Sequence, residues 1–363
     1  MQLKLDALTG IGFREVEPFP KCWVYPSKAG STIVPIFKVL MSNVCEINCF
    51  YCASRAGRSF REYSFTPEEL AATFASLYEK GLVKGIFLSS AIEQSPNKIM
   101  EKMLKAIEII RFKQGFKGYV HLKLMPGAER GYIERACEVA TRVSVNLEAP
   151  GQDRLKRISP KKDFDSILDM IKDTSKLIGD RNVSQTSQFV IGAADEPDRE
   201  VLEVCEKLHQ EYKLKRCYFE AFRPIPGTPL EEKPATPKRR ESRLYQADML
   251  LRDYGFKAEE LPFDDKGNLP LEKDPKLLWA LSHAEKFPLE INNASPQELR
   301  RVPGVGPLTA AKIVEMRAKG KIRDISQLKL CGVKVGKASP FILLEGRKTS
   351  PQLPLEPSLF DSH

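Results

Sequence analysis

Short apolar runs alternate with longer amphipathic stretches from Ile33 to about Phe222. The short runs have the length of strands, and the longer stretches have the spacing of helices with one apolar face, so together they predict a parallel sheet wrapped by helices. We expect six strands, at Pro35 to Met41, Gly85 to Ser89, Tyr119 to Leu124, Val143 to Glu148, Gln185 to Ile191 and Arg216 to Phe222. Six parallel strands are too few to close an eight-stranded barrel, so the α/β pattern predicts a partial (β/α)6 barrel.

One helix start is marked clearly, directly after the first expected strand and its loop. Thr66 as N-cap, Pro67 at the first helical position and Glu69 three residues after the cap form a capping box. We therefore expect a helix to begin at Pro67.

Polar residues alternate with apolar ones in the fourth expected strand. Ser144, Asn146 and Glu148 fall on one face of that strand, and His121 and Lys123 fall on one face of the strand before it. Because helices cover the outside of such a barrel, the polar side chains must line its lumen. Buried polar groups need partners, and a bound ligand would provide them.

The alternation stops after Phe222, and a different pattern follows. Ser295 and Pro296 mark the start of a short helix, which leads into the loop Val302-Pro303-Gly304-Val305-Gly306-Pro307 and a second helix from about 308 to 318. This arrangement resembles a helix-hairpin-helix motif, a unit that binds DNA regardless of the DNA sequence. The glycines permit a tight turn and let backbone amides approach a phosphate, towards which the next helix directs its positive end.

The hairpin predicts a set of phosphate contacts. The loop provides Gly304, Val305 and Gly306, and Lys312 on the following helix adds a charge. A second, degenerate copy of the motif follows at 331–338, where the expected contacts are Gly332, Lys334, Gly336 and Lys337. A helical hairpin used for protein contacts is the alternative.

Charge supports the nucleic-acid interpretation. The net charge is +9, and residues 286–347 hold twelve Lys and Arg against five Asp and Glu, a net of +7. The basic excess therefore belongs to the hairpin region, and it predicts a polyanionic partner for that region only.

Length and composition predict the organisation of the chain. With 363 residues, of which 42% are hydrophobic, we expect more than one domain. The expected divisions are an N-terminal extension (1–32), a partial barrel (33–230), a helical, proline-rich connector (231–285), a small all-α helix-hairpin-helix domain (286–347) and a disordered tail (348–363). No apolar run is long enough to cross a membrane, and the start Met1-Gln2-Leu3-Lys4 lacks a signal segment, so we expect a soluble cytoplasmic protein.

Three cysteines follow the first expected strand. Cys45, Cys49 and Cys52 have three and then two residues between them. Three thiolates held this closely in one loop can ligate three irons of a cubane cluster and leave the fourth iron open to another ligand. Zinc would need a fourth ligand from a distant cysteine or from one of four histidines, and a reducing compartment disfavours a disulfide framework for the eight cysteines.

The cysteine spacing and the aromatic pair Phe50 and Tyr51 resemble the radical S-adenosyl-L-methionine (SAM) enzymes. The resemblance implies a 4Fe-4S cluster whose open iron chelates SAM, and an electron transfer that releases a 5′-deoxyadenosyl radical. It also implies the TIM-like partial barrel of the radical SAM type. An electron donor such as flavodoxin or ferredoxin is then required.

The same resemblance suggests which residues bind SAM. Ser89 and Ser90 stand where the family has a glycine-glycine-glutamate motif, from which they depart in residue type. Gly192 is in a segment similar to the one that lies beside the adenine. The expected cofactor-binding set is Tyr51, Ser89, Ser90, Lys123, Asn146, Glu148 and Gly192.

From about Phe37 to Gly346 the chain is similar to a family of radical SAM proteins proposed to modify or repair DNA and linked with uracil-DNA-glycosylase-like partners. Matching segments include 38–52, 64–70, 85–90, 245–248 and 254–260. The N-terminus departs from that family, because it has only Cys22 where members carry a longer segment with extra cysteines. The resemblance implies an enzyme that acts on a base in DNA, and Cys217 on the sixth strand is the candidate hydrogen-atom donor.

Two alternatives remain at this point. The same cluster and phosphate contacts would serve an RNA-modifying radical SAM enzyme, although the sequence contains no recognisable RNA-binding domain. A non-catalytic iron-sulfur protein that binds DNA and senses redox state is the second alternative. Polar residues along the barrel strands disfavour a sensor, because an idle lumen would be apolar.

Overall fold

The structure is a computed structural model that describes residues 2–10, 24–29 and 32–349. Cys22 and residues 350–363 of the expected tail lie outside the described residues. The chain forms two compact units. The first extends to Glu196 and also contains Leu208–Thr236, and the second contains Pro197–Lys207 and the chain from Pro237 onwards.

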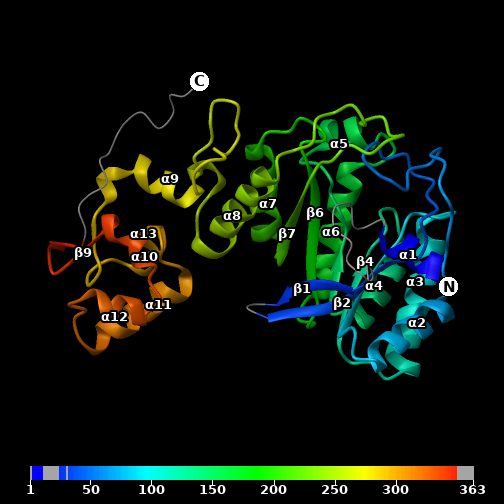
Figure 1. The fold of residues 1–363 in the computed structure, drawn as a ribbon, viewed down its shortest axis with the longest axis horizontal. Coiled ribbons are helices and arrows are strands. Elements are labelled where there is room, and N and C mark those ends of the chain that lie inside the picture. Colours follow the sequence, from blue (N-terminus) through cyan, green and yellow to red (C-terminus); the bar gives the residue numbers. More distant parts are fainter. Residues whose placement is uncertain (1, 11–23, 30–31, 350–363) are drawn as a thin grey trace. The chain divides into compact units, whose positions relative to one another are not determined.

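A seven-stranded sheet forms the centre of the first unit, and it curls into a half-barrel (Figure 1). The strands are neighbours in sequence order. All adjacent pairs from β2 to β7 are parallel, and β1 is antiparallel to β2. The strands are β1 (Val24–Ala29), β2 (Thr32–Leu40), β3 (Gly85–Ser89), β4 (Tyr119–Lys123), β5 (Arg142–Ser144), β6 (Ser184–Ile191) and β7 (Arg216–Ala221).

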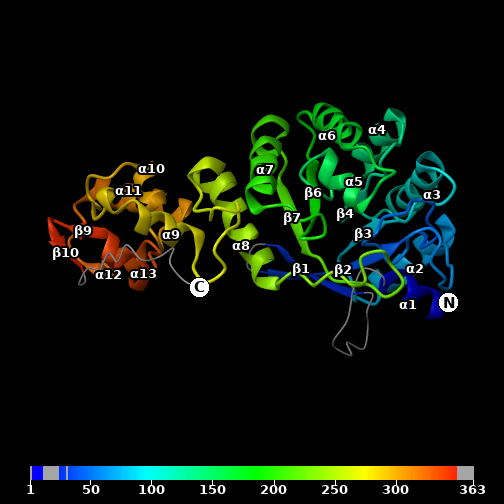
Figure 2. The same cartoon turned by 90° about the horizontal axis from the view of Figure 1, so that it is seen from above.

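Helices connect the parallel strands and cover the outer face of the sheet (Figure 2). Two helices, α5 and α6, lie between β5 and β6, and a π-helical turn at Ile109–Lys113 continues α3. The helices up to β7 are α1 (Gln2–Gly10), α2 (Pro67–Glu79), α3 (Pro96–Glu108), α4 (Arg130–Val139), α5 (Gln152–Ile158), α6 (Phe164–Ile178) and α7 (Asp198–Tyr212). Over the described residues, none of the helices combines the length and the apolar character that crossing a membrane requires.

The partial barrel predicted from the sequence is confirmed. The six expected strands are present, and the bounds of β3 agree with the expectation. Two features differ. The sequence pattern did not indicate β1, which pairs with β2, and the strand expected to continue to Glu148 ends at Ser144.

The two faces of the sheet differ in polarity. The outer side chains Leu88, Leu122 and Val143 are fully buried. The amide of Gln185 on β6 donates to the carbonyl of Ile171 on α6 at 3.2 Å, which identifies the helix-covered face of that strand. The inner face carries polar and aromatic side chains instead, so the core of this unit lies between the sheet and its helices.

The second unit is mainly helical. It contains the expected hairpins, and its main segment begins at Pro237, within the stretch that the sequence suggested as a connector. A three-stranded sheet in the order β10-β9-β8 accompanies the helices. The elements are α8 (Lys238–Met249), α9 (Pro275–Ser282), β8 (Leu289–Glu290), α10 (Pro296–Arg301), α11 (Pro307–Lys319), α12 (Ile325–Leu330), α13 (Val335–Ala338), β9 (Ile342–Leu344) and β10 (Arg347–Lys348).

The capping box at the start of α2 gives a first testable prediction. The hydroxyl of Thr66 accepts from the Glu69 amide at 3.1 Å, and the Glu69 carboxylate accepts from the Thr66 amide at 2.9 Å. Replacing Thr66 by Ala should lower the free energy of unfolding by about 1 kcal/mol, because a helix amide loses its acceptor. Urea denaturation measures this loss, with Thr66→Ser as the control. Equal stability of the two variants would show that the cap contributes nothing.

Candidate metal centre and nucleic-acid interface

The loop that carries the three cysteines follows β2 and is fixed from two sides. On one side, the amide of Glu46 donates to the carbonyl of Ile92, which follows β3, at 3.0 Å. On the other side, the amide of Phe50 donates to the carbonyl of Ile158, the last residue of α5, at 2.8 Å. The sheet edge and the end of α5 therefore hold the loop at the carboxyl ends of the strands.

The cysteines themselves are free thiols in this loop. Cys49 is buried, and its sulfur lies 3.1 Å from the hydroxyl oxygen of Ser159. Burial and the neighbouring Cys49 raise the pKa of Cys52 to about 12, while Lys162 lowers it. A thiol in such surroundings ionises when a metal centre binds it, because the metal charge stabilises the thiolate.

The donor set fits an iron-sulfur cluster better than a single metal ion. The loop offers three thiols, whereas a structural zinc site normally has four protein ligands. A cubane spreads its ligands over separate irons, so three spaced thiolates of one loop suit it.

A chain of polar contacts joins the cysteine loop to the inner face of the sheet. Tyr51 lies between two of the cysteines, and its hydroxyl donates a hydrogen bond to the Glu148 carboxylate. The ammonium of Lys162 lies 3.0 Å from the same carboxylate. The amide group of Asn146 donates to Glu148 at 3.5 Å and accepts from the Lys123 ammonium. Four of the expected cofactor-binding residues, Tyr51, Lys123, Asn146 and Glu148, thus meet at one place.

Electrostatics keep these groups charged despite burial. Burial raises the pKa of Glu148, but Lys162 and Lys123 outweigh it, so the carboxyl remains ionised. Burial works against the charge of Lys162 as well, but Glu148 and Cys49 raise its pKa overall. Burial lowers the pKa of Lys123 to about 8. The site therefore combines an anion, two ammonium groups and the cysteine thiols, which suits a ligand with its own amino and carboxylate groups.

The reason these residues converge differs from the one that the sequence indicated. The alternation from Ser144 to Glu148 predicted a single strand, but the backbone leaves the β conformation, and Glu148 has a left-handed φ of 68°. The Leu147 amide donates to the Ser187 hydroxyl at 3.2 Å in place of a ladder bond. The Glu148 backbone then pairs with Gln188 and Val190. An irregular segment after Ser144 therefore brings Glu148 to the loop, and Glu148 there forms an isolated parallel bridge to Phe189.

The remaining expected SAM residues have local structural roles. The hydroxyl of Ser90 contacts both the amide and the carbonyl of Ser42, at 3.2 and 3.4 Å, and so ties β3 to the residues before the cysteines. Ser89 ends β3 on the same face as Phe87. Gly192 has a left-handed φ of 86°, and its amide donates to the carboxylate of the buried Glu196.

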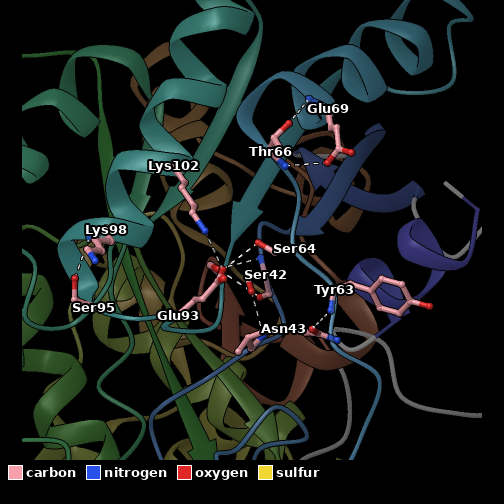
Figure 3. Close-up of polar contacts among 12 residues, drawn as sticks. Ser42, Asn43, Tyr63, Ser64, Thr66, Glu69, Glu93, Ser95, Lys98 and Lys102 are labelled. Atoms are coloured by element: carbon pink, nitrogen blue, oxygen red, sulfur yellow. Dashed lines mark hydrogen bonds and ion pairs between the residues drawn. The ribbon is translucent and has the colours of Figure 1, made fainter.

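Sequence reasoning missed Glu93, which lies four residues after β3 (Figure 3). Its carboxylate accepts from the hydroxyl of Ser64 at 3.0 Å and from the ammonium of Lys102 at 3.2 Å. Burial raises its pKa, but Ser42, Ser64 and Lys102 lower it overall. An acidic residue shortly after the second parallel strand was the available signal.

Cys217 does not face the lumen. The hydroxyl of Tyr218 accepts from the inner-face Arg142, and neighbouring strand residues point to opposite faces. Cys217 is fully buried on the outer face, and the ring of Phe219, two residues on, stacks on that of Phe189. The structure therefore places Cys217 on the outer face of β7, and not on the inner face that the role of hydrogen-atom donor requires.

In the second unit, the two expected hairpin loops contact each other. The amide of Lys334 in the second loop donates to the carbonyl of Gly304 in the first at 3.0 Å. Gly304 has a φ of 83°, and a Cβ there would lie 2.7 Å from the Lys334 carbonyl oxygen, so only glycine fits. The hydroxyl of Thr309 on α11 approaches the carbonyl of Gly332 at 3.4 Å. Both turns therefore form one surface.

Three exposed lysines border this surface, namely Lys312, Lys334 and Lys337. A Cβ on Gly304 would lie within 3.3 Å of side-chain atoms of both Lys334 and Lys337. Burial raises the pKa of Cys331, and Lys312 is close enough to that thiol to oppose the shift. The first intrahelical bond of α11 runs from Ala310 to Gly306, so the preceding amides at the helix start point outward. These groups can bind phosphate.

Other expected hairpin contacts are different in the structure. Val305 is 1% exposed, and its amide donates to the carbonyl of Val302 at 3.1 Å. Neither its side chain nor its amide is therefore available to bind a phosphate. Gly306 has a φ of −97°, and a Cβ there would lie 3.3 Å from the Tyr254 hydroxyl oxygen. Gly336 lies inside α13 with open space around it. The structural requirement for glycine is clear at Gly304 and Gly332.

A buried lysine supports the first hairpin loop. The ammonium of Lys276 on α9 donates to the carbonyl of Val305 at 2.6 Å and lies 4.5 Å from the centre of the Tyr254 ring. Burial lowers the pKa of Lys276 to about 7, which Asp274 partly offsets. The sequence placed Lys276 in a connector, but its contact shows that α9 is part of the structural support of the hairpin.

Comparisons with known proteins agree with these two sites. Residues 39–208 match a family model described as the radical SAM superfamily, and residues 286–332 match one described as the helix-hairpin-helix motif. Members of the radical SAM superfamily use a 4Fe-4S cluster and SAM. No curated protein sequence is similar enough to the chain to count as a match.

Solved structures are similar to this chain at low sequence identity. The hydrogenase maturase HydG is 16% identical with a TM-score of 0.50, over 60% of this chain and 49% of its own. Methylornithine synthase PylB is 14% identical with a TM-score of 0.49, over 60% and 61%. A radical SAM methyltransferase from Sphaerobacter thermophilus is 16% identical with a TM-score of 0.46, over 60% and 64%. The match thus spans about half of HydG, and it shows the fold alone.

Lys276 makes stability depend on pH. Its pKa of about 7 lies below the ordinary 10.5, so between these values the folded protein binds fewer protons than the unfolded one. Stability should therefore rise with pH above about 7, by at most roughly 1.4 kcal/mol per pH unit. We expect wild type to gain stability relative to Lys276→Met between pH 7 and 9 in denaturation experiments. The exposed Lys319→Met is the control, and a constant difference across this range would contradict the prediction.

Proposed function

We propose that this chain, which carries a radical SAM domain and a helix-hairpin-helix motif, is a radical SAM enzyme that modifies or repairs a base in DNA. When bound, the cluster and SAM supply a 5′-deoxyadenosyl radical that abstracts hydrogen from an unreactive carbon. The observation that carries the proposal is the presence in one chain of a cysteine loop at the strand ends and of paired hairpin loops edged by lysines.

The residues have distinct roles in this proposal. Cys45, Cys49 and Cys52 hold the cluster, and Lys162 with Glu148 provides charges beside it that fit the amino and carboxylate groups of SAM. The hairpins hold the phosphate backbone without reading the sequence, because backbone amides and lysines contact phosphates and not base edges. The target base then reaches the barrel by leaving the stack, which costs a few kcal/mol and favours damaged or unpaired bases.

Partners follow from the same proposal. Reduction of the cluster needs a one-electron donor such as flavodoxin or ferredoxin. A uracil-DNA-glycosylase-like protein would act on the same damaged DNA. RNA is the alternative substrate, and the activity test below distinguishes it from DNA.

The activity test uses anaerobic reconstitution with iron and sulfide, followed by dithionite and SAM. We expect wild type to form 5′-deoxyadenosine, and the triple variant Cys45→Ala, Cys49→Ala and Cys52→Ala to form none, because it has no ligands for the cluster. Cys137→Ala, at a buried cysteine of α4, controls for the loss of a thiol. A protein that holds a four-iron cluster but releases no 5′-deoxyadenosine would contradict the enzymatic proposal. Stimulation by damaged DNA or by RNA then identifies the substrate.

The hairpin lysines should determine how DNA binding depends on salt. Removing one lysine that neutralises a phosphate reduces the slope of log K against log salt concentration by about 0.9. We expect the variant Lys312→Ala, Lys334→Ala and Lys337→Ala to bind duplex DNA more weakly and with a shallower slope, measured by fluorescence anisotropy. Lys319→Ala, at the end of α11, is the matched control. An unchanged slope in the triple variant would show that this surface does not contact phosphates.

A further inference from the structure

Aromatic and basic side chains occupy the inner face of the half-barrel. They lie on the amino-terminal side of Lys123, away from the carboxyl ends of the strands. We define the basal patch as Lys38, Phe87, Tyr119, His121, Arg142 and Tyr218. All but His121 are half-buried, whereas the outer face of the same strands is apolar and fully buried. Polar and charged groups on a half-buried face need partners, so this composition indicates a binding surface.

Arg142 lies at the centre of the patch. Its Nε donates to the hydroxyl of Ser184 at 3.0 Å and its Nη1 to the hydroxyl of Tyr218 at 3.3 Å. Its guanidinium also lies 5.8 Å from the centre of the Tyr119 ring, and it donates a hydrogen bond to the Tyr119 hydroxyl. A guanidinium has five N–H donors, so these contacts fix its orientation and leave donors for a ligand. Both tyrosine rings are held in place by the same group.

Planar rings flank this arginine. The ring of His121 stacks on that of Phe87, with centres 4.3 Å apart and planes 20° from parallel, and it lies edge-on to Tyr119. The ammonium of Lys38 lies 5.7 Å from the centre of the Phe87 ring. The patch therefore offers ring faces next to hydrogen-bond donors.

The charge of the inner face favours an anionic, acceptor-rich ligand. Lys38, Lys123 and Arg142 lie on this face, and the carboxylates that act on them are Glu220 at Lys38 and Glu148 at Lys123. Burial and these three cations hold the pKa of His121 well below its ordinary value, so the imidazole is neutral and bonds the hydroxyl of Ser144 at 2.8 Å.

We propose that the basal patch binds an unpaired nucleotide, an inference that rests on the proposed action on nucleic acid. Aromatic side chains stack on bases that have left the helix, and arginine donors bind their acceptor atoms or a phosphate. Tyr119 and Lys123 are four residues apart on β4, a rise of about 13 Å. A nucleotide on the patch therefore extends along the inner face towards the cysteine loop.

The test compares two fluorescein-labelled DNA duplexes of the same sequence, one fully paired and one with a single unpaired nucleotide. The full-length, reconstituted protein is titrated with each duplex, and anisotropy gives the two affinities. We expect wild type to prefer the unpaired nucleotide by about tenfold, the size of one stacking contact. The double variant Arg142→Gln and Tyr218→Leu should lose this preference but still bind the paired duplex through the hairpins.

Two controls separate recognition from folding. Tyr218→Phe keeps the ring and should retain most of the preference. Arg135→Gln removes the same charge from α4, where Arg135 pairs with Glu101 and Glu108, and should leave the preference intact. Iron content and urea denaturation show whether the double variant is folded.

The outcomes distinguish the inference from the function on which it rests. If wild type binds both duplexes equally, or if a folded double variant keeps the preference, the basal patch is not the nucleotide site, while the proposed action on DNA stands. If wild type binds neither duplex nor single-stranded RNA, the proposed action on nucleic acid fails, and this inference fails with it.

Discussion

The buried carboxylate of Glu148 determines how the cysteine loop meets the sheet. Burying a charge without partners is unfavourable, and here three groups meet it: the ammonium of Lys162, the hydroxyl of Tyr51 and the amide of Asn146. Tyr51 belongs to the cysteine loop and Asn146 contacts Lys123 on β4. One side chain therefore connects the candidate metal centre with the inner face of the sheet, and any ligand bound there shares its charges.

The polarity of the sheet explains why a binding surface exists beside that centre. The outer face packs against helices and is apolar, so it stabilises the unit. The inner face does not pack against these helices, and it carries the arginine, lysine and aromatic side chains of the basal patch. The second unit uses a similar separation, in which buried groups such as Lys276 support the hairpin from within while exposed lysines border its loops.

Much of the fold was predictable because it depends on local patterns. The parallel strands were visible as short apolar runs, since the face that packs against the helices must be hydrophobic. Thr66, Ser95 and Ser295 cap helices directly before a proline, and the first and last of these caps were recognised. The hairpin turn was recognised from its glycines, of which Gly304 requires a positive φ. The strand β1 was missed because its pairing with β2 is a tertiary contact that its own sequence does not signal.

The sequence by itself determined the chemistry: three cysteines spaced for an iron-sulfur cluster, a sheet of six parallel strands, and hairpin loops in a basic segment. Only the tertiary structure decided which side chains meet. It turned Glu148 towards Tyr51 through the left-handed backbone conformation of Glu148 itself. It also placed Cys217 on the outer face and brought Lys276 beneath Val305. The physical reason is that spacing along the chain determines ligand type and local conformation, whereas burial and charge pairing act between residues far apart in sequence.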